Sequence, residues 1–174
     1  MIIQNYINTI AKCSRPAEGV TRLPFTNDHV AANKLLKKWM TDAGLKISLD
    51  AAGTLIGRYI SPIKNSKTLL IGSHQDSGYN SGRYDGIMGI ILPILALKEL
   101  NKKKISLPFN VEILAFADEE GVRFPTALMG PRSLAGTFNL KDLKLKDKNN
   151  ITIEQALKNF GSVSYTHLRA HETG

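Results

Sequence analysis

Three short segments of the chain concentrate side chains that could hold metal ions and move protons. Residues 72–76 read Gly-Ser-His-Gln-Asp, residues 83–86 read Arg-Tyr-Asp-Gly, and residues 117–121 read Ala-Asp-Glu-Glu-Gly. The first and third segments each end an apolar, strand-like run, and the second begins a helix-like run. One imidazole and several carboxylates would therefore meet at the carboxyl edge of a sheet, where α/β folds place their ligands. This set of groups predicts a hydrolase that uses two metal ions.

His74 is the candidate nitrogen ligand. A single histidine is more often a structural or surface residue than a metal ligand. Asp76, two residues further on, favours ligation, because a carboxylate that accepts the other ring N–H fixes the tautomer and raises the basicity of the ligating nitrogen. The alternative for Asp76 is a turn residue that caps the local backbone.

The other candidate ligands are carboxylates. Asp85 directly precedes a helix-like run, so it could be an N-cap, a bridge between two cations, or both. Asp118, Glu119 and Glu120 stand side by side at the end of a strand, where like charges repel one another and resist desolvation. A solvated loop would tolerate them, whereas a metal cluster would neutralise them. Adjacent side chains leave the chain in different directions, so one glutamate can bind metal while its neighbour takes a proton.

Helical patterns surround these segments. Apolar residues recur at helical spacing in residues 2–11 and 30–43. Residues 86–100 are apolar nearly all round, which predicts a deeply buried helix that Pro93 either kinks or occupies near the first turn. Thr-Ile-Glu-Gln at 152–155 resembles a capping box before a short last helix.

Strand patterns alternate with these helices. Residues 46–50 and 54–60 read as a hairpin. Continuous apolar runs at 68–71 and 111–117 predict strands that are buried on both faces. Strands that alternate with helices predict an α/β fold, with a mixed or largely parallel sheet flanked by helices.

The composition is that of one ordinary globular domain, with 174 residues, 43% hydrophobic and 22% charged. No apolar run approaches the roughly 20 residues that a bilayer span needs. The first residues lack the pattern of a secretory signal, so a cytoplasmic location with no membrane partner is expected. The single cysteine, Cys13, excludes an internal disulfide and is interpreted as a structural thiol.

A formal net charge of +8 raises the question of a nucleic-acid partner. Much of the excess lies in two lysine groups, Lys102, Lys103 and Lys104, and Lys141, Lys144, Lys146 and Lys148. Both groups lack the interleaved aromatic residues that stack on bases. Solvated lysines are the favoured interpretation, so no nucleic-acid partner is expected. A non-catalytic binding module with a basic face remains the alternative from another class.

The last twelve residues differ in character from the rest. Residues 163–173 resemble the conceptual translation of a sequencing-library adaptor. Residues 163–174 are therefore interpreted as a non-native tail, and residues 1–162 as the amino-terminal part of a catalytic domain. His167 and His171, which have the spacing of a metal pair on a helix, would then be artefacts.

At these motifs the chain resembles the M20-type metal-dependent amidohydrolases, in the branch of the allantoate amidohydrolases and N-carbamoyl-L-amino-acid hydrolases. The likeness runs from about residue 19 to residue 138. Besides the three segments above, it includes Arg22-Leu23, Gly53-Thr54, Val-Arg-Phe at 122–124 and Gly-Pro-Arg-Ser-Leu-Ala-Gly at 130–136. The wording of the later motifs is most similar to the allantoate branch.

The resemblance implies a role for each candidate residue. His74 would bind one metal ion, Asp85 would bridge two, and Glu120 would bind the second. Glu119 would be the general base, and Asp76 would support His74. The two divalent ions would be zinc or manganese, which suit carboxylates with some imidazole. They would polarise a carbamoyl or amide carbonyl and activate a water, whose proton Glu119 takes and passes to the leaving nitrogen.

The resemblance also sets expectations for substrate, partners and completeness. Allantoate is the first candidate substrate, an N-carbamoyl-L-amino acid is the alternative, and the full-length protein is expected to be a homodimer. Family members are more than twice as long and carry further histidine ligands and a second domain that this sequence lacks. Outside the tail only His29 and His74 remain, with His29 expected on the surface. We therefore expect a truncated catalytic domain that is inactive as written and binds metal weakly.

Overall fold

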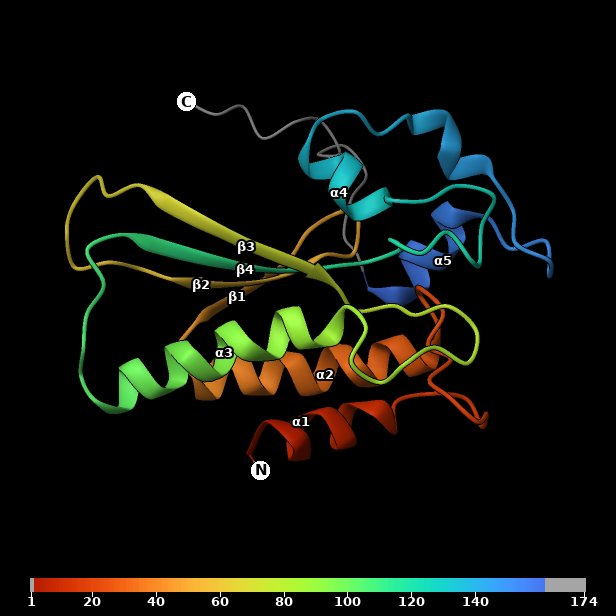
Figure 1. The fold of residues 1–174 in the computed structure, drawn as a ribbon. Helices are drawn as coiled ribbons and strands as arrows, with labels where there is room; N and C mark the ends of the chain where they lie inside the picture. The colour runs from red at the N-terminus through yellow and green to blue at the C-terminus, as the bar shows by residue number, and fades with distance from the viewer. Residues whose placement is uncertain (1, 162–174) are drawn as a thin grey trace.

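The computed structural model describes residues 2–161, which form one β-sheet with helices packed against it (Figure 1). The elements follow in the order α1 (Ile2–Ala11), α2 (Asn27–Asp42), β1 (Lys46–Leu49), β2 (Leu55–Tyr59), β3 (Thr68–His74), α3 (Ile87–Lys102), β4 (Asn110–Phe116), α4 (Met129–Leu134), the 3-10 helix η1 (Leu140–Lys144) and α5 (Ile153–Phe160). This order confirms the α/β fold. The tail at 163–174 lies outside the described residues, so its interpretation stays a prediction.

The sheet is mixed, with the strand order β1-β2-β4-β3. β1 and β2 form the expected antiparallel hairpin, and β2 pairs antiparallel with β4. β3 and β4 run parallel, with His74 opposite Phe116 in the last pair of their register. Because α3 connects these two strands, both end at the same edge of the sheet. Segments that follow β3 and β4 therefore start side by side.

Helices α2 and α3 cover one face of the sheet, and α1 packs beneath them (Figure 1). Their apolar stripes meet the inward side chains of the strands in a core that includes Ile7, Leu36, Ile91 and Ile113. A second cluster lies toward the carboxyl edge and joins Phe25 and Phe124 to Ile153 and Phe160 of α5. Ala115 belongs to the first core and Ala117 to the second, so the chain that leads into the acidic segment is packed in both.

Local hydrogen bonds explain where several elements begin. Thr26 caps α2 by accepting the N–H of His29. Asp50 shapes the β1–β2 turn, because its Oδ1 accepts the N–H groups of Ala52 and Thr54. The capping box before α5 is confirmed in both directions between Thr152 and Gln155.

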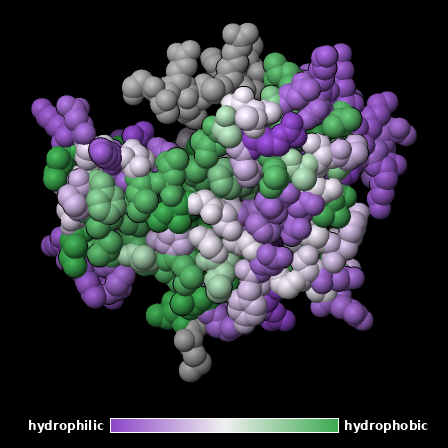
Figure 2. All heavy atoms as spheres, turned by 45° about the horizontal axis from the view of Figure 1, so that its top comes forward, coloured by the Kyte–Doolittle hydropathy of each residue, from purple (hydrophilic) through white to green (hydrophobic). Residues whose placement is uncertain are grey.

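The expectation that β3 is buried on both faces is wrong. Leu69 and Leu70 are 48% and 49% exposed. β3 is an edge strand, and the described helices α2 and α3 cover only one face of the sheet. On the face that Figure 2 shows, apolar side chains gather at the left and centre, over the strands, and polar side chains lie mainly at the right, over the segments beyond the strand ends. By contrast, β4 is an interior strand and is largely buried, as predicted.

Helix α3 is also less buried than its composition predicted. Ile87, Ile90 and Ile94 face the core, but Met88 and Leu92 are more than two-fifths exposed. Pro93 lies inside the helix, beyond its first turn. None of the helices within residues 2–161 is long and apolar enough to cross a membrane.

Candidate metal centre

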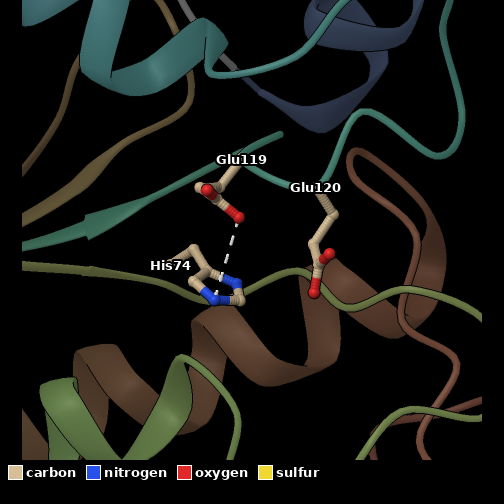
Figure 3. A group of neighbouring side chains, drawn as sticks. All are labelled: His74, Glu119 and Glu120. Carbon is tan, nitrogen blue, oxygen red and sulfur yellow. Dashed lines mark ion pairs between the residues drawn. The ribbon is translucent and has the colours of Figure 1, made fainter.

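The carboxyl ends of β3 and β4 bring together an imidazole and two carboxylates from distant parts of the chain. His74 ends β3, and Glu119 and Glu120 follow the end of β4. One ligand atom from each of these three residues lies within 4.8 Å of the others. Figure 3 shows the two glutamates reaching toward the His74 ring from the loop above it. The parallel pairing of β3 and β4 is what creates this meeting point.

The tautomer of His74 follows from one hydrogen bond. Its Nδ1 lies 3.0 Å from the main-chain oxygen of Asp76. A carbonyl oxygen can only accept, so Nδ1 carries a proton and Nε2 is directed at other groups. Nε2 lies 3.6 Å from Asp85 Oδ1 and 3.9 Å from Glu119 Oε2. A nitrogen lone pair facing two carboxylates is unfavourable unless a cation, either a proton or a metal ion, lies between them.

Asp76 supports His74 with a different atom from the one expected. Its carboxylate is 4.0 Å from Nδ1, whereas its main-chain oxygen makes the hydrogen bond. The carboxylate instead accepts the main-chain N–H groups of Glu119 and Glu120, at 3.2 and 3.3 Å. Burial raises the pKa of Asp76, and these two N–H groups act against that rise. Asp76 therefore ties the loop after β3 to the loop after β4.

The three adjacent acids separate in the structure. Asp118 is fully buried, and both of its oxygens lack a hydrogen-bond partner within the described residues. Burial and the nearby Asp76 raise the pKa of Asp118 to about 8. Asp118 adopts a left-handed backbone conformation, with φ of 55°. The next two residues, Glu119 and Glu120, direct their side chains toward His74. Glu119 and Glu120 are therefore the members of the triplet available to a metal ion.

Asp85 lies beside the group rather than inside it. Its side chain is 57% exposed, and it is not the N-cap of α3, which is Gly86. Gly86 has a φ of 63°, and a Cβ there would lie 2.6 Å from the His74 ring. The glycine thus lets the chain pass directly against the imidazole and brings Asp85 to Nε2.

These residues fit a divalent metal ion. Carboxylate oxygens with one imidazole nitrogen are donors that both zinc and manganese accept. Nε2 faces two carboxylates, an arrangement that a bound cation would relieve. His74, Glu119 and Glu120 could hold one ion, and Asp85 is placed to share His74 with them.

The expectation that His29 lies on the surface is wrong, because it is fully buried. Its Nδ1 accepts the N–H of Phe25 at 2.9 Å, and its ring packs 4.5 Å from that of Phe160. Burial and the charge of Arg22 lower the pKa of His29 to about 3, so the ring is neutral. The local sequence predicts only that His29 lies near the start of a helix. It does not show that aromatic residues distant in the sequence cover the ring.

Other residues that the sequence singled out have structural partners. Arg132 forms an ion pair with Asp142 at 3.1 Å and donates a hydrogen bond to Thr126, so it connects α4 to the segments on either side of it. Cys13 is partly buried, and burial raises the pKa of its thiol, as expected of an unreactive cysteine. The seven lysines of the two basic groups are all exposed. His167 and His171 lie outside the described part of the chain.

Arg22 and Gln75 stand in motifs that carry the resemblance, but the sequence analysis gave them no role in the site. Arg22 is 3% exposed and donates from Nε to the main-chain oxygen of Gln75 at 2.6 Å. Gln75 lies between His74 and Asp76 and is itself fully buried. The available signal was an arginine inside the short apolar run Val-Thr-Arg-Leu, where a charge needs several internal partners.

Comparison with known proteins gives a consistent set of relatives, although no family model matches the chain. An N-carbamoyl-L-amino acid amidohydrolase of Geobacillus stearothermophilus is 37% identical over 147 residues, which are 84% of this chain and 36% of the relative. An allantoate deiminase of Arabidopsis thaliana is 37% identical over 154 residues, which are 87% of this chain and 29% of the relative.

A solved structure agrees with these relatives. A hydantoinase/carbamoylase family amidase of Burkholderia ambifaria superimposes with a TM-score of 0.89 and 30% identity, over 97% of this chain and 41% of the amidase. The chain thus spans about two fifths or less of the length of the proteins it matches. By its motifs, its fold and these relatives, the chain is homologous, over the part that it spans, to the allantoate and N-carbamoyl-L-amino-acid amidohydrolases, which is consistent with the M20 branch that its sequence resembles.

Proposed function

We propose that this chain is the amino-terminal part of a metal-dependent amidohydrolase that cleaves a linear carbamoyl or amide C–N bond. The observation that carries the proposal is the group of His74, Glu119 and Glu120, whose ligand atoms lie within 4.8 Å of one another. The names of the relatives support the same chemistry. In this proposal residues 1–162 belong to the catalytic domain, and residues 163–174 are a non-native tail.

The residues divide the work by their positions. His74 and Glu120 would bind metal, Asp85 would be shared between two ions, and Glu119 would be the general base. Bound zinc or manganese would polarise the carbonyl of the substrate and lower the pKa of water toward about 7. Glu119 takes the proton of the attacking water and returns it to the leaving nitrogen as the C–N bond breaks. Its carboxylate is about one-third exposed, which leaves it accessible to water and substrate.

Asp76 and Gly86 hold this arrangement. Asp76 keeps the proton of His74 on Nδ1 through its main-chain oxygen and holds Glu119 and Glu120 through their N–H groups. Gly86 lets Asp85 approach Nε2. Neither residue has to touch the substrate, so both are positioning residues.

Allantoate is the first candidate substrate, and its hydrolysis would yield ureidoglycine, carbon dioxide and ammonia. An N-carbamoyl-L-amino acid is the second, supported by the 37% identity to the Geobacillus stearothermophilus amidohydrolase. Both substrates present a carbamoyl group on nitrogen and a carboxylate, so a single site could take either. We further infer a cytoplasmic homodimer for the full-length protein, from the resemblance alone.

The 174-residue chain alone is proposed to be inactive and to bind metal weakly. Apart from the general base Glu119, the described residues offer three candidate ligands, His74, Asp85 and Glu120, which are too few to fill two coordination shells. Sustained release of ammonia from allantoate by the purified chain would contradict this.

The decisive experiment uses the uninterrupted gene product with zinc or manganese. Turnover of allantoate is compared with turnover of N-carbamoyl-L-amino acids, for the wild type and for Glu119→Gln. We expect one substrate class to be preferred, and the glutamine variant to lose at least about 100-fold in kcat while still binding metal. Equal activity of wild type and Glu119→Gln would remove the general base from the proposal.

A further inference from the structure

We propose that Arg22 is a positioning residue of the metal centre, where its buried guanidinium fixes the peptide plane between Gln75 and Asp76. The inference rests on the proposed function, because it concerns the residue that holds His74, Glu119 and Glu120 together. Arg22 itself touches none of these three side chains through a hydrogen bond within the described residues.

The guanidinium of Arg22 is buried without an ion pair. It is 3% exposed, and no carboxylate within residues 2–161 forms a salt bridge with it. It donates instead to three main-chain oxygens, those of Gln75 at 2.6 Å, Ile10 at 3.1 Å and Cys13 at 3.0 Å. A buried charge is costly unless its donors are satisfied, so this geometry is stable only while those carbonyl groups stay in place.

The backbone of residue 22 adds two more connections to the same loop. The N–H of Arg22 donates to Ser77 Oγ at 2.8 Å, and the N–H of Ser77 donates to the oxygen of Arg22 at 3.0 Å. Together with the bond from Nε to Gln75, they hold the loop on both sides of Asp76.

Arg22 binds the main-chain oxygen of Gln75, which the sheet does not hold. The N–H of Gln75 donates to the oxygen of Phe116, and its side chain donates to that of Ala115, each at 3.0 Å. These bonds attach Gln75 to β4 but leave its carbonyl free to rotate. This carbonyl is part of the peptide group that joins Gln75 to Asp76. The hydrogen bond from Arg22 Nε therefore sets the orientation of that peptide group.

The orientation of Asp76 then reaches the candidate ligands directly. Its main-chain oxygen sets the tautomer of His74, and its carboxylate holds the N–H groups of Glu119 and Glu120. A rotation of the preceding peptide would displace all three contacts together. The other end of the arginine fork lies on carbonyl groups at the end of α1, so this helix end anchors the metal centre.

The test compares Arg22→Lys and Arg22→Met in the 174-residue chain, with Leu36→Ala as a matched control. Lysine keeps the charge but cannot reproduce a fork that reaches three carbonyl groups. Leu36 is fully buried in the core formed with α2, so its truncation lowers stability without touching the loop. If the arginine variants do not fold, Ser77→Ala is used instead. It removes the hydrogen bond from the N–H of Arg22 to Ser77 Oγ.

Two readouts are measured at a temperature where each variant is fully folded. The first is affinity for Co²⁺, followed by its visible spectrum, which we expect to weaken at least ~10-fold in the Arg22 variants and not in Leu36→Ala. The second is amide hydrogen exchange, which should accelerate in residues 75–78 and 118–121 and remain unchanged in β1 and β2.

The outcomes separate the two proposals. If the wild type binds no Co²⁺ but the exchange pattern is as expected, the metal centre fails and the positioning role of Arg22 stands. If the wild type binds Co²⁺ and the Arg22 variants bind it within twofold, with unchanged exchange in both segments, the positioning role is overturned. If Leu36→Ala weakens Co²⁺ binding as much as Arg22→Lys, general destabilisation explains the effect and the inference is overturned as well.

Discussion

The Nδ1 atom of His74 hydrogen bonds to the main-chain oxygen of Asp76 at 3.0 Å, and not to its carboxylate at 4.0 Å. A carboxylate can lose its charge by protonation, whereas a carbonyl oxygen remains an acceptor at every pH. The tautomer of the candidate ligand is therefore fixed by the backbone. The carboxylate is free to hold the opposite loop through two N–H groups.

The first prediction concerns Asp76→Asn. The backbone bond to His74 survives, but an amide presents only one acceptor to the N–H groups of Glu119 and Glu120. We expect metal affinity to fall about 10-fold and the free energy of unfolding to fall by about 1–3 kcal/mol. Co²⁺ titration and urea unfolding measure the two effects. Asp42→Asn, at an exposed pair with Lys38, is the control and should change neither quantity appreciably.

The second prediction concerns Gly86→Ala. The new Cβ would lie 2.5 Å from the main-chain oxygen of His74 and 2.6 Å from its ring, at a φ of 63° that disfavours alanine. Either the imidazole or the loop of Asp85 must move, so we expect metal affinity to drop and stability to fall by about 1–3 kcal/mol. Gly82→Ala is a close control, because no atom lies within 4 Å of its Cβ position. Equal affinities of the two variants would contradict the role given to Gly86.

The third prediction is a pH dependence from His29. The pKa of His29 is about 3 in the folded chain and ordinarily 6.5, so between these pH values the unfolded state binds the extra proton. His29 therefore favours folding fully above pH 6.5, and this contribution is lost as the pH falls toward 3. The slope from one proton is about 1.4 kcal/mol per pH unit.

His29→Asn tests this dependence, since asparagine can still accept the N–H of Phe25. In urea unfolding between pH 5 and 7, the free energy of unfolding should rise with pH more steeply in the wild type than in the variant, by up to about 1.4 kcal/mol per pH unit. Asp118 and Asp76, whose pKa values are raised by burial, give a slope of the opposite sign in this window. They do so in both proteins, so the difference between the two slopes reports on His29. An identical slope in both proteins would show that His29 takes up its proton without unfolding.

Local patterns predicted the elements and the meeting of the candidate ligands well. The apolar runs before His74 and Asp118 placed both strand ends, and the parallel pairing of β3 and β4 then brought His74 to Glu119 and Glu120. The positions of the strand ends could be predicted because a strand and the turn that follows it are determined largely by a few neighbouring residues. The sequence could not tell which atom of Asp76 faces His74, because that depends on a peptide orientation set from Arg22.

Burial was the least predictable property. An apolar run shows that a strand can be buried, but not which faces other elements cover, and so β3 was misjudged. His29 was misjudged in the opposite direction, because Phe160 lies far away in the sequence and covers its ring. The role of Arg22 escaped notice for the same reason, since its acceptors lie in α1, in the loop after it and after β3. Each error concerns contacts between segments that are distant in the sequence.

The last prediction concerns the open edge of the sheet. No described strand pairs with β3 on its outer side, and Leu70 is 49% exposed on the face opposite the core. Exposed apolar edge strands promote association between chains, and a charge on the edge opposes it. We expect Leu70→Lys to reduce self-association of the 174-residue chain, measured by light scattering over a range of concentrations. The free energy of unfolding should change by no more than about 0.5 kcal/mol.

Ile71→Lys is the matched control, because the neighbouring side chain points to the other face and packs against the core. Ile71 is partly buried, so an ammonium there loses apolar packing and part of its hydration, and the free energy of unfolding should fall by about 1–3 kcal/mol. The two variants carry the same charge one residue apart, so only the direction of the side chain distinguishes them. If Leu70→Lys proves as destabilising as Ile71→Lys, then Leu70 is covered in solution and β3 is not a free edge.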